Sequence, residues 1–281
     1  MKPISIIIFF AFAIFTANSQ EKAFQSDKLQ MLWESPKDLQ TPESVCFDIA
    51  NQVLYVSNIN GKPTDKDGNG FISLLSVDCK ITELKWISGL NAPKGMGIYN
   101  GKLYVTDIDR VAVININNKS IEQFFEFPEA KFLNDIAIDK SGAVYISDMM
   151  SNRIYRIFEN KPELWLDDKN LTDPNGLFID KDKLFVGCNK IVEISLNDKN
   201  IHSWLENTGG IDGLKGLGNG RFIFSDWTGS VYLVNEDREI EKLLDISTIG
   251  LNAADIEILP EKNIFYVPTF NGNKVIAYQL K

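Results

Sequence analysis

The sequence has few of the residues that usually supply nucleophilic catalysis. It contains one histidine, His202, three cysteines and no Gly-x-Ser-x-Gly motif. We predict that His202 lies in an outer strand, away from any cysteine that it might otherwise activate. The sequence therefore favours neither a serine nucleophile nor a Cys–His pair.

Cysteine and positive charge are also scarce. Cys46, Cys79 and Cys188 are too few for a disulfide scaffold and leave one thiol over, so we expect small buried hydrophobic residues instead. Lysine and arginine number 29 against 38 acidic residues, which gives a net charge of −9. This balance argues against a nucleic-acid partner, which would need a basic surface, and leaves open the binding of a cation.

A strongly apolar run lies near the N-terminus. Lys2 is followed by an apolar stretch from Ile4 to Ala17, with small residues before Gln20. We interpret residues 1–19 as a secretory signal peptide. A membrane anchor is the alternative, but the run is shorter than the ~20 residues that a spanning helix needs. We expect a secreted, monomeric mature protein without a membrane span, with the bacterial periplasm as the preferred compartment.

A polar, turn-rich cluster that leads into an apolar, β-prone segment recurs along the chain. The clearest copy is Asp173–Asp180, and the six copies centre on positions 43, 94, 134, 175, 212 and 255. Successive copies are therefore 51, 40, 41, 37 and 43 residues apart. A period near 40 residues that contains several strands is typical of a β-propeller.

Each copy predicts four short strands. A second strand rich in β-branched and aromatic residues follows each cluster, and a predicted fourth strand carries one large apolar residue in register. The residues in this outer column are Trp86, Phe125, Trp165, Trp204 and Leu244. We predict that the tryptophans of the column pack between blades rather than bind a ligand.

The two ends of the repeat array predict how the ring closes. The last copy ends after three strands, at Lys281, whereas Leu29–Glu34 precedes the first cluster and has the pattern of a fourth strand. We therefore predict an all-β fold, a single six-bladed β-propeller over residues 20–281. Each blade would have four antiparallel strands, and the N-terminal strand would close the last blade and hide its edge.

In a propeller, the loops that lead into the innermost strands meet at one mouth of the central channel. The six clusters would therefore form a ring of Glu43, Lys94, Asn134, Asn175, Asp212 and Asp255. Carboxylate and amide oxygens suit calcium, magnesium or manganese, and Glu43, Asn175 and Asp212 could bind one cation together. The alternative is that these Asn-Gly and Asp-Gly pairs only make turns.

At these clusters the chain resembles a known family. Segments Thr41–Ser44, Asn134–Gly142, Asp173–Leu177 and Ile211–Leu214 are similar to the regucalcin and gluconolactonase family, and more distantly to paraoxonase-like lactonases. The resemblance implies one divalent metal, usually calcium, at Glu43, Asn175 and Asp212, with zinc, manganese or magnesium as alternatives. It also implies that Asn134 contacts the substrate or metal-bound water, and that Asp212 is the general base in lactone hydrolysis.

Two residues depart from that family pattern. Phe132 stands where the sugar-lactone enzymes usually carry an arginine, which removes a bidentate hydrogen-bond donor, and Lys94 adds an ammonium group to the ring. We therefore expect both residues to contact the substrate and to favour a more apolar or differently charged lactone or ester. Asp135, beside Asn134, is predicted either to orient a ligand or to stabilise a turn.

Further residues are predicted near the same mouth. Asp148, like Asp107 and Asp226, follows a second strand and is expected to face the channel, and Trp227 is predicted to line the pocket. The long first repeat places an insertion, residues 58–70, over the mouth as a partial lid. Part of it matches the start of a calcium loop, but Ser76 stands where such a loop needs glutamate. We interpret it as a polar hairpin, with a second calcium site as the alternative.

Two functions remain open from the sequence. The first is a divalent-metal-dependent hydrolase of a lactone or related ester, in which a carboxylate activates water and a cation polarises the carbonyl. The second is a non-catalytic propeller, similar to NHL-type repeats, that binds a ligand or protein through its top face. The three metal-competent oxygens favour the hydrolase.

Overall fold

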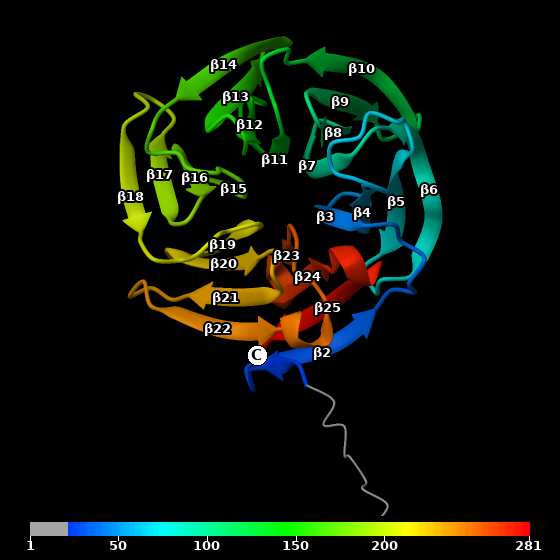
Figure 1. Cartoon of the computed structure of the whole chain (residues 1–281), viewed down its shortest axis with the longest axis vertical. Helices are drawn as coiled ribbons and strands as arrows, with labels where there is room; N and C mark the ends of the chain where they lie inside the picture. Colours follow the sequence, from blue (N-terminus) through cyan, green and yellow to red (C-terminus); the bar gives the residue numbers. More distant parts are fainter. Residues whose placement is uncertain (1–21) are drawn as a thin grey trace, which may run out of the picture.

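The protein forms a closed ring of β-sheets around a central channel (Figure 1). This computed structural model describes residues 22–281, so the expected signal peptide lies outside the described residues. The helical segments of the described part are three short 3₁₀ turns: η1 (Ser247–Ile249), η2 (Pro260–Lys262) and η3 (Phe270–Gly272). None of the helices in residues 22–281 has the length and apolar character needed to cross a membrane.

Six antiparallel sheets make up the ring, each with its first strand at the channel and its last on the outside. The first three blades are β3 (Pro42–Asp48), β4 (Val53–Asn58), β5 (Gly70–Ser76) and β6 (Ile81–Leu90); β7 (Pro93–Tyr99), β8 (Lys102–Asp107), β9 (Arg110–Asn115) and β10 (Ser120–Glu126); and β11 (Leu133–Ile138), β12 (Val144–Asp148), β13 (Arg153–Phe158) and β14 (Lys161–Asp167). The last three are β15 (Leu177–Asp180), β16 (Lys183–Gly187), β17 (Ile191–Ser195) and β18 (Ile201–Leu205); β19 (Leu214–Gly218), β20 (Arg221–Asp226), β21 (Ser230–Val234) and β22 (Ile240–Asp245); and β23 (Glu257–Leu259), β24 (Ile264–Pro268), β25 (Val275–Leu280) and β2 (Leu29–Glu34). The predicted six-bladed propeller is confirmed.

The N-terminal strand closes the sixth blade, as predicted. β2 pairs antiparallel with β25, so that Leu29 lies opposite Leu280. A short strand before it, β1 (Phe24–Gln25), was not expected and pairs with β22 of the fifth blade. The N-terminal segment therefore adds to two neighbouring sheets.

The outer aromatic column packs inside the sheets and between them. Trp86 is buried against Tyr55, with ring centroids 4.7 Å apart, and Trp165 meets Tyr145 edge-on at 4.9 Å. Trp204 is only half-buried and packs on Phe222. The prediction that these tryptophans belong to the core is confirmed. All three cysteines are buried and free, as expected.

Glycines allow the innermost strands to approach one another closely at the channel. A Cβ atom on Gly95 would lie 2.5 Å from the backbone oxygen of Asn134 in the next blade. One on Gly176 would lie 2.5 Å from the backbone oxygen of Asp212. No side chain fits at those distances, so both positions require glycine. Gly95 and Gly176, which follow Lys94 and Asn175, thereby allow neighbouring polar clusters to lie in contact.

Replacing Trp165 tests the packing of the outer column. We expect Trp165→Ala to lower the free energy of unfolding by about 3–5 kcal/mol, because it leaves a cavity beside Tyr145. The adjacent residue Leu164 is exposed, so Leu164→Ala should change stability by only about 0.5 kcal/mol. Denaturant unfolding of both variants measures the difference, and equal losses would contradict the assignment of Trp165 to the core.

Candidate functional site

A cavity of about 250 Å³ opens at the mouth of the channel where the innermost strands begin. We call it the upper cavity. Its polar floor consists of Glu43, Lys94, Asn134, Asn175 and Asp212, and its apolar wall of Ile59, Pro63, Phe132, Met149, Trp227 and Phe270. The structure therefore brings together five members of the ring expected from the sequence.

Hydroxyl groups on the second strands turn the ring residues toward the channel. The backbone N–H of Ser44, directly after Glu43, donates to Ser57 Oγ at 2.9 Å. In the fifth blade, the N–H of Gly213, directly after Asp212, donates to Ser225 Oγ at 2.8 Å. In the first blade this bond lies at a register irregularity between Pro42 and Val45. In both blades the serine hydroxyl fixes the backbone directly after the ring residue.

Two buried oxygens of the floor have no hydrogen-bond donor. Asn175 Nδ2 donates to Asp212 Oδ1 at 3.1 Å, so the amide oxygen Asn175 Oδ1 is left without a partner, as is Glu43 Oε2. Unpaired buried acceptors are costly, and hard divalent cations bind such oxygens. Glu43, Asn175 and Asp212 therefore fit a divalent cation.

The donor set depends on the amide of Asn175. Across residues 22–281, no three His, Cys, Asp or Glu side chains are grouped so that they could hold a metal ion by themselves. In the 58–70 insertion, Asn69 Nδ2 donates to Asp67 Oδ2 at 2.6 Å and Asn60 Nδ2 to the Asn69 carbonyl at 2.9 Å. These contacts order the polar loop between β4 and β5.

Burial and mutual repulsion shift the carboxyl groups of the floor toward their neutral forms. Burial raises the pKa of Glu43 well above its ordinary value, and the charges of Asp212 and Asp255 raise it further. Burial likewise raises the pKa of Asp212, with Asp255 as the next cause. A bound cation would favour the ionised forms of both groups.

Lys94 and Phe132 form one unit in the cavity. Lys94 is fully buried, and its ammonium donates to the Ala92 carbonyl at 3.0 Å and lies 4.3 Å from the centroid of the Phe132 ring. Burial lowers the pKa of Lys94 to about 8, although Glu43 and Asp107 oppose that shift. The Phe132 ring therefore stabilises the charged ammonium group of Lys94 through a cation–π contact.

Asn134 and Asp135 have separate environments although they are adjacent. Asn134 lines the upper cavity, where its Nδ2 has only a weak contact with Met149 Sδ at 3.9 Å. Asp135 does not line the cavity. Its carboxylate accepts hydrogen bonds from the backbone N–H groups of Ile136 and Leu177, so it joins the third blade to the fourth.

The predicted position of Asp148 differs from the observed one. Asp148 is fully buried outside the cavity lining and accepts hydrogen bonds from the backbone N–H groups of Lys131 and Phe132, both at 2.9 Å. Asp107 likewise accepts hydrogen bonds from the backbone N–H groups of Asn91 and Ala92, in the loop that precedes Lys94. These aspartates fix the loops that carry the cavity residues, because a carboxylate at the end of a second strand lies beside the entry to the first.

Asp255 lies one layer below the upper cavity. Its Oδ2 accepts a hydrogen bond from Ser44 Oγ at 2.6 Å, and its Oδ1 lies 3.6 Å from Lys215 Nζ. Burial raises the pKa of Asp255, and Lys215 opposes the shift. Asp255 therefore lies in the channel but outside the lining of the upper cavity, where the ring predicted it, and it acts on the floor through its charge.

The apolar wall contains residues that sequence reasoning missed. Ile59, Met149 and Phe270 lie just beyond second strands, at positions that correspond closely to that of Trp227. Trp227 itself lines the cavity and packs edge-on against Phe270 at 5.6 Å. A large apolar residue within two positions of the end of a second strand would have been the signal for Ile59, Met149 and Phe270.

The insertion contributes to the same wall. Ile59 and Pro63 come from residues 58–70, and the loop is attached to the second blade by an ion pair between Lys66 and Asp109. A hydrogen bond of 3.2 Å from the Gly68 N–H to Asn91 Oδ1 adds to this attachment. The predicted overhang at the mouth is thus observed.

Comparison with known proteins supports the architecture. No protein-family model and no curated protein matches the chain. Among solved structures, a streptogramin B lyase aligns with a TM-score of 0.65 and 16% identity over 90% of this chain and 97% of that one. A catalytically inactive histidine-to-alanine variant of virginiamycin B lyase from Staphylococcus aureus, solved with quinupristin, aligns at 0.63 and 17% over 90% and 99%. The selenomethionine form of that lyase aligns at 0.61, with the same identity and coverage.

The chain shares its six-bladed propeller fold with these lyases. At these identities the likeness concerns the fold alone, and it does not establish membership of the regucalcin family.

The carboxyl groups of the floor predict a pH dependence of stability. In the metal-free protein, folding raises the pKa of Glu43 and of Asp212 above the unfolded value of about 4. The two groups therefore contribute stability that is fully present below the unfolded pKa. This stability is lost as the pH rises through the folded pKa values. We expect the unfolding free energy in chelator to fall less steeply with pH in Asp212→Asn than in wild type. Asp237→Asn, on an exposed turn, is the control and should keep the wild-type slope. Denaturant unfolding between about pH 5 and 8 measures how the unfolding free energy of each protein changes with pH. A pH dependence in Asp212→Asn equal to that of wild type would contradict the burial of this charge.

Proposed function

We propose that the protein is a divalent-metal-dependent hydrolase of a lactone or related ester. The observation that carries the proposal is the pair of buried oxygens, Glu43 Oε2 and Asn175 Oδ1, without donors beside the carboxylate of Asp212. The motif resemblance to the regucalcin and gluconolactonase family supports the same assignment. Calcium is the first candidate because all the donors are hard oxygens, with magnesium, manganese and zinc as alternatives.

The metal would supply charge stabilisation at the reacting carbonyl. When bound, a divalent cation polarises an ester carbonyl and stabilises negative charge on its oxygen. Glu43, Asn175 and Asp212 would hold it. The resemblance assigns Asp212 a second task, as the base that takes a proton from the attacking water. Water then adds to the acyl carbon, the ring C–O bond breaks, and the proton passes to the leaving oxygen to give a hydroxy acid.

The other floor residues would orient the substrate. Asn134 Nδ2 has only the weak contact with Met149, so it can donate to the substrate carbonyl or to the reacting water. Lys94 is held in place by the Ala92 carbonyl and the Phe132 ring, which leaves further N–H bonds of its ammonium for an ester oxygen or for the carboxylate of the product.

The wall favours an apolar substrate. Phe132, Met149, Trp227 and Phe270 supply aromatic and thioether surface, where the related sugar-lactone enzymes usually have an arginine in place of Phe132. A cavity of about 250 Å³ holds a small ring with a short substituent. We therefore propose a small lactone or ester with an apolar acyl part rather than a sugar lactone.

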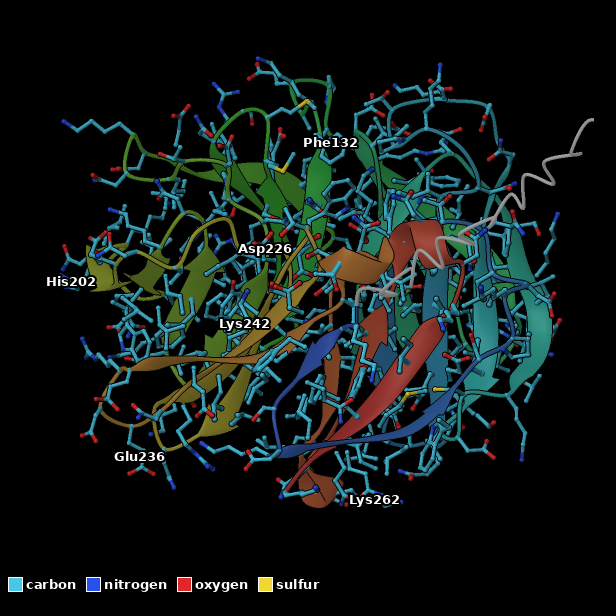
Figure 2. All side chains as sticks on the ribbon, turned by 60° about the horizontal axis from the view of Figure 1, so that its bottom comes forward. Phe132, His202, Asp226, Glu236, Lys242 and Lys262 are labelled. Atoms are coloured by element: carbon cyan, nitrogen blue, oxygen red, sulfur yellow. The ribbon has the colours of Figure 1, made fainter. Side chains whose placement is uncertain are left out.

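The histidine of this chain argues for a carboxylate base. One aligned lyase structure is a histidine-to-alanine variant described as catalytically inactive. Here the single histidine, His202, is exposed on β18 at the outer edge of the fourth blade, far from the cavity (Figure 2). A histidine-dependent reaction in the upper cavity is therefore not proposed for this chain.

We also propose the setting in which this enzyme acts. The apolar N-terminal run supports secretion, with the periplasm as the compartment. The net charge of −9 supports a small-molecule partner rather than a nucleic acid. The pairing of β2 with β25, which closes the ring within one chain, supports a monomer.

Metal binding and hydrolysis test the proposal together. We expect wild type to bind one calcium ion per chain in titration calorimetry, and Glu43→Gln and Asp212→Asn to weaken binding by at least about tenfold, because each removes a charged ligand. Asp212→Asn should also lower kcat for lactone hydrolysis by about a hundredfold or more. A pH-stat with a panel of lactones and esters measures the rate.

Matched variants control for the loss of charge. Glu236→Gln and Asp237→Asn make the same chemical changes on the exposed turn between β21 and β22 and should leave metal binding and hydrolysis unchanged. If no metal binds and all variants behave like wild type, the hydrolase proposal is wrong and the non-catalytic propeller is favoured.

Trp227 tests the preference for apolar substrates. We expect Trp227→Ala to reduce kcat/KM for an alkyl-substituted lactone by about tenfold, with a smaller change for the unsubstituted ring, because the alkyl group loses its contact with the indole. Met150→Ala is the control, since Met150 is exposed and outside the cavity lining. Equal losses for both lactones would show that Trp227 does not select the substituent.

A further inference from the structure

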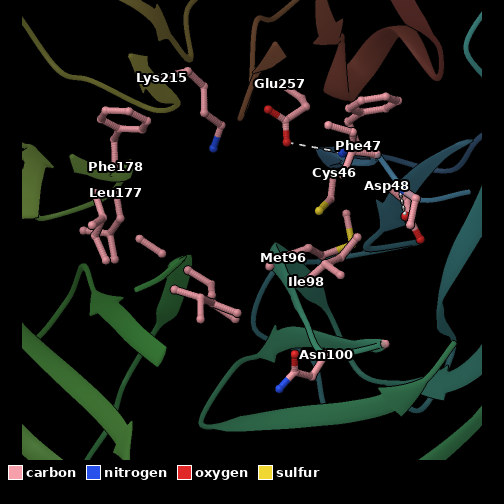
Figure 3. Close-up of a pocket in the computed structure, with 18 residues that line it drawn as sticks. Cys46, Phe47, Asp48, Met96, Ile98, Asn100, Leu177, Phe178, Lys215 and Glu257 are labelled. Atoms are coloured by element: carbon pink, nitrogen blue, oxygen red, sulfur yellow. Dashed lines mark hydrogen bonds between the residues drawn. The ribbon is translucent and has the colours of Figure 1, made fainter. Parts of the chain in front are cut away.

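The opposite mouth of the channel contains a second and larger cavity. It measures about 520 Å³ and is lined by residues that lie two or more positions further along each inner segment than the ring residues of the upper cavity. We call it the lower cavity. Residues from all six blades line it, so it is a product of the complete ring (Figure 3).

Two oppositely charged side chains extend into the lower cavity from neighbouring blades. Lys215 of β19 is only 13% exposed, and its ammonium nitrogen points into the cavity. Its nearest carboxylate oxygen is Asp255 Oδ1 at 3.6 Å, beyond ordinary hydrogen-bond length. Burial alone would lower the pKa of Lys215, but Asp255, Asp135 and Glu257 together raise it, so the side chain is charged.

Glu257 of β23 is fixed beside it. Its Oε2 accepts a hydrogen bond from the Phe47 N–H at 3.3 Å and its Oε1 one from the Ile258 N–H at 2.7 Å. Each carboxylate oxygen can accept further bonds, and Figure 3 shows the group facing the open part of the cavity. The cavity therefore offers one donor group with free N–H bonds and one acceptor group in fixed positions.

The remaining wall of the lower cavity is mostly apolar. Met96, Ile98, Ile136, Leu177 and Ile179 from the second, third and fourth blades line the cavity. Figure 3 shows Met96 and Ile98 on the side opposite Lys215 and Glu257. Such a wall provides a favourable environment for an aliphatic group about the size of a leucine side chain.

The charges decide which ligand fits. A simple carboxylate would meet Glu257 and Asp255 as well as Lys215, and a simple amine would meet the ammonium of Lys215. A molecule that carries an ammonium, a carboxylate and an apolar group on the same carbon satisfies the pair and the wall together. We propose that the lower cavity binds a free amino acid with an apolar side chain. Its carboxylate contacts Lys215, its ammonium contacts Glu257, and its side chain lies against Met96, Ile136 and Leu177.

Calorimetry with L-leucine and its partial analogues tests the proposal on wild-type protein. With chelator present to keep metal from the upper cavity, leucine should bind one molecule per chain. Its decarboxylated form, 3-methylbutylamine, its deaminated form, 4-methylpentanoate, and glycine should each bind at least about tenfold more weakly, because each lacks one of the three contacts.

A substitution of Glu257 tests whether leucine binds in the lower cavity. Glu257→Gln keeps the size of the side chain and should weaken leucine binding by about tenfold, because the ammonium of leucine loses its charged partner. The same change should not weaken binding of 4-methylpentanoate, because it removes a negative charge that repels this carboxylate. Glu236→Gln, on the exposed turn, is the matched control and should leave leucine binding unchanged, and thermal melts show that each variant is folded.

Three results would overturn the proposal. They are no leucine binding up to about 10 mM, analogues that bind as tightly as leucine, and an unchanged leucine affinity in folded Glu257→Gln. None of them bears on the upper cavity, because these measurements use neither metal nor lactone.

Discussion

The structure depends on how buried charge is arranged along the central channel. The carboxyl groups of Glu43, Asp135, Asp212 and Asp255 are all buried there, against the two ammonium groups of Lys94 and Lys215. Burying like charges together is costly unless counter-charges and hydrogen bonds compensate for it. The lysines, the backbone donors to Asp135 and the hydroxyl of Ser44 provide part of that compensation, and a divalent cation at the upper cavity would add the charge that the floor itself lacks.

This arrangement separates the two ends of the channel chemically. The upper cavity has donor-poor oxygens surrounded by aromatic side chains, whereas the lower cavity has a fixed Lys215–Glu257 pair surrounded by aliphatic ones. Asp255 lies between them and contacts Ser44 above and Lys215 below. One buried layer therefore supports both sites, while the side chains that a ligand would touch differ completely.

Much of the fold follows from periodicity in the sequence. Repeated polar clusters, β-branched second strands and an apolar residue in each fourth strand give the number of blades and the closing role of Leu29–Glu34. The two-residue strand Phe24–Gln25 could not be predicted, because it has no pattern of its own and forms only where β22 offers an edge. Strand repeats thus reveal architecture better than they reveal isolated pairings.

The site was predictable where the repeat itself carried the chemistry. Glu43, Asn175 and Asp212 stand in equivalent columns, so the ring could be inferred from spacing. Adjacent positions were harder, because neighbouring side chains on a strand point to opposite sides, and this places Asn134 in the cavity and Asp135 between blades. Asp148 was misplaced because its carboxylate accepts hydrogen bonds from the loop before β11, and repeat spacing does not reveal such bonds.

The pairing of Leu29 with Leu280 has a consequence for biosynthesis. A ribosome makes β2 well before β25, so the two edges that seal the ring cannot meet until β25 has left the ribosome. Until then β2 remains an unpaired edge, and five blades can assemble before the sixth. Emergence of β25 is therefore the earliest moment at which either mouth of the channel acquires its final shape.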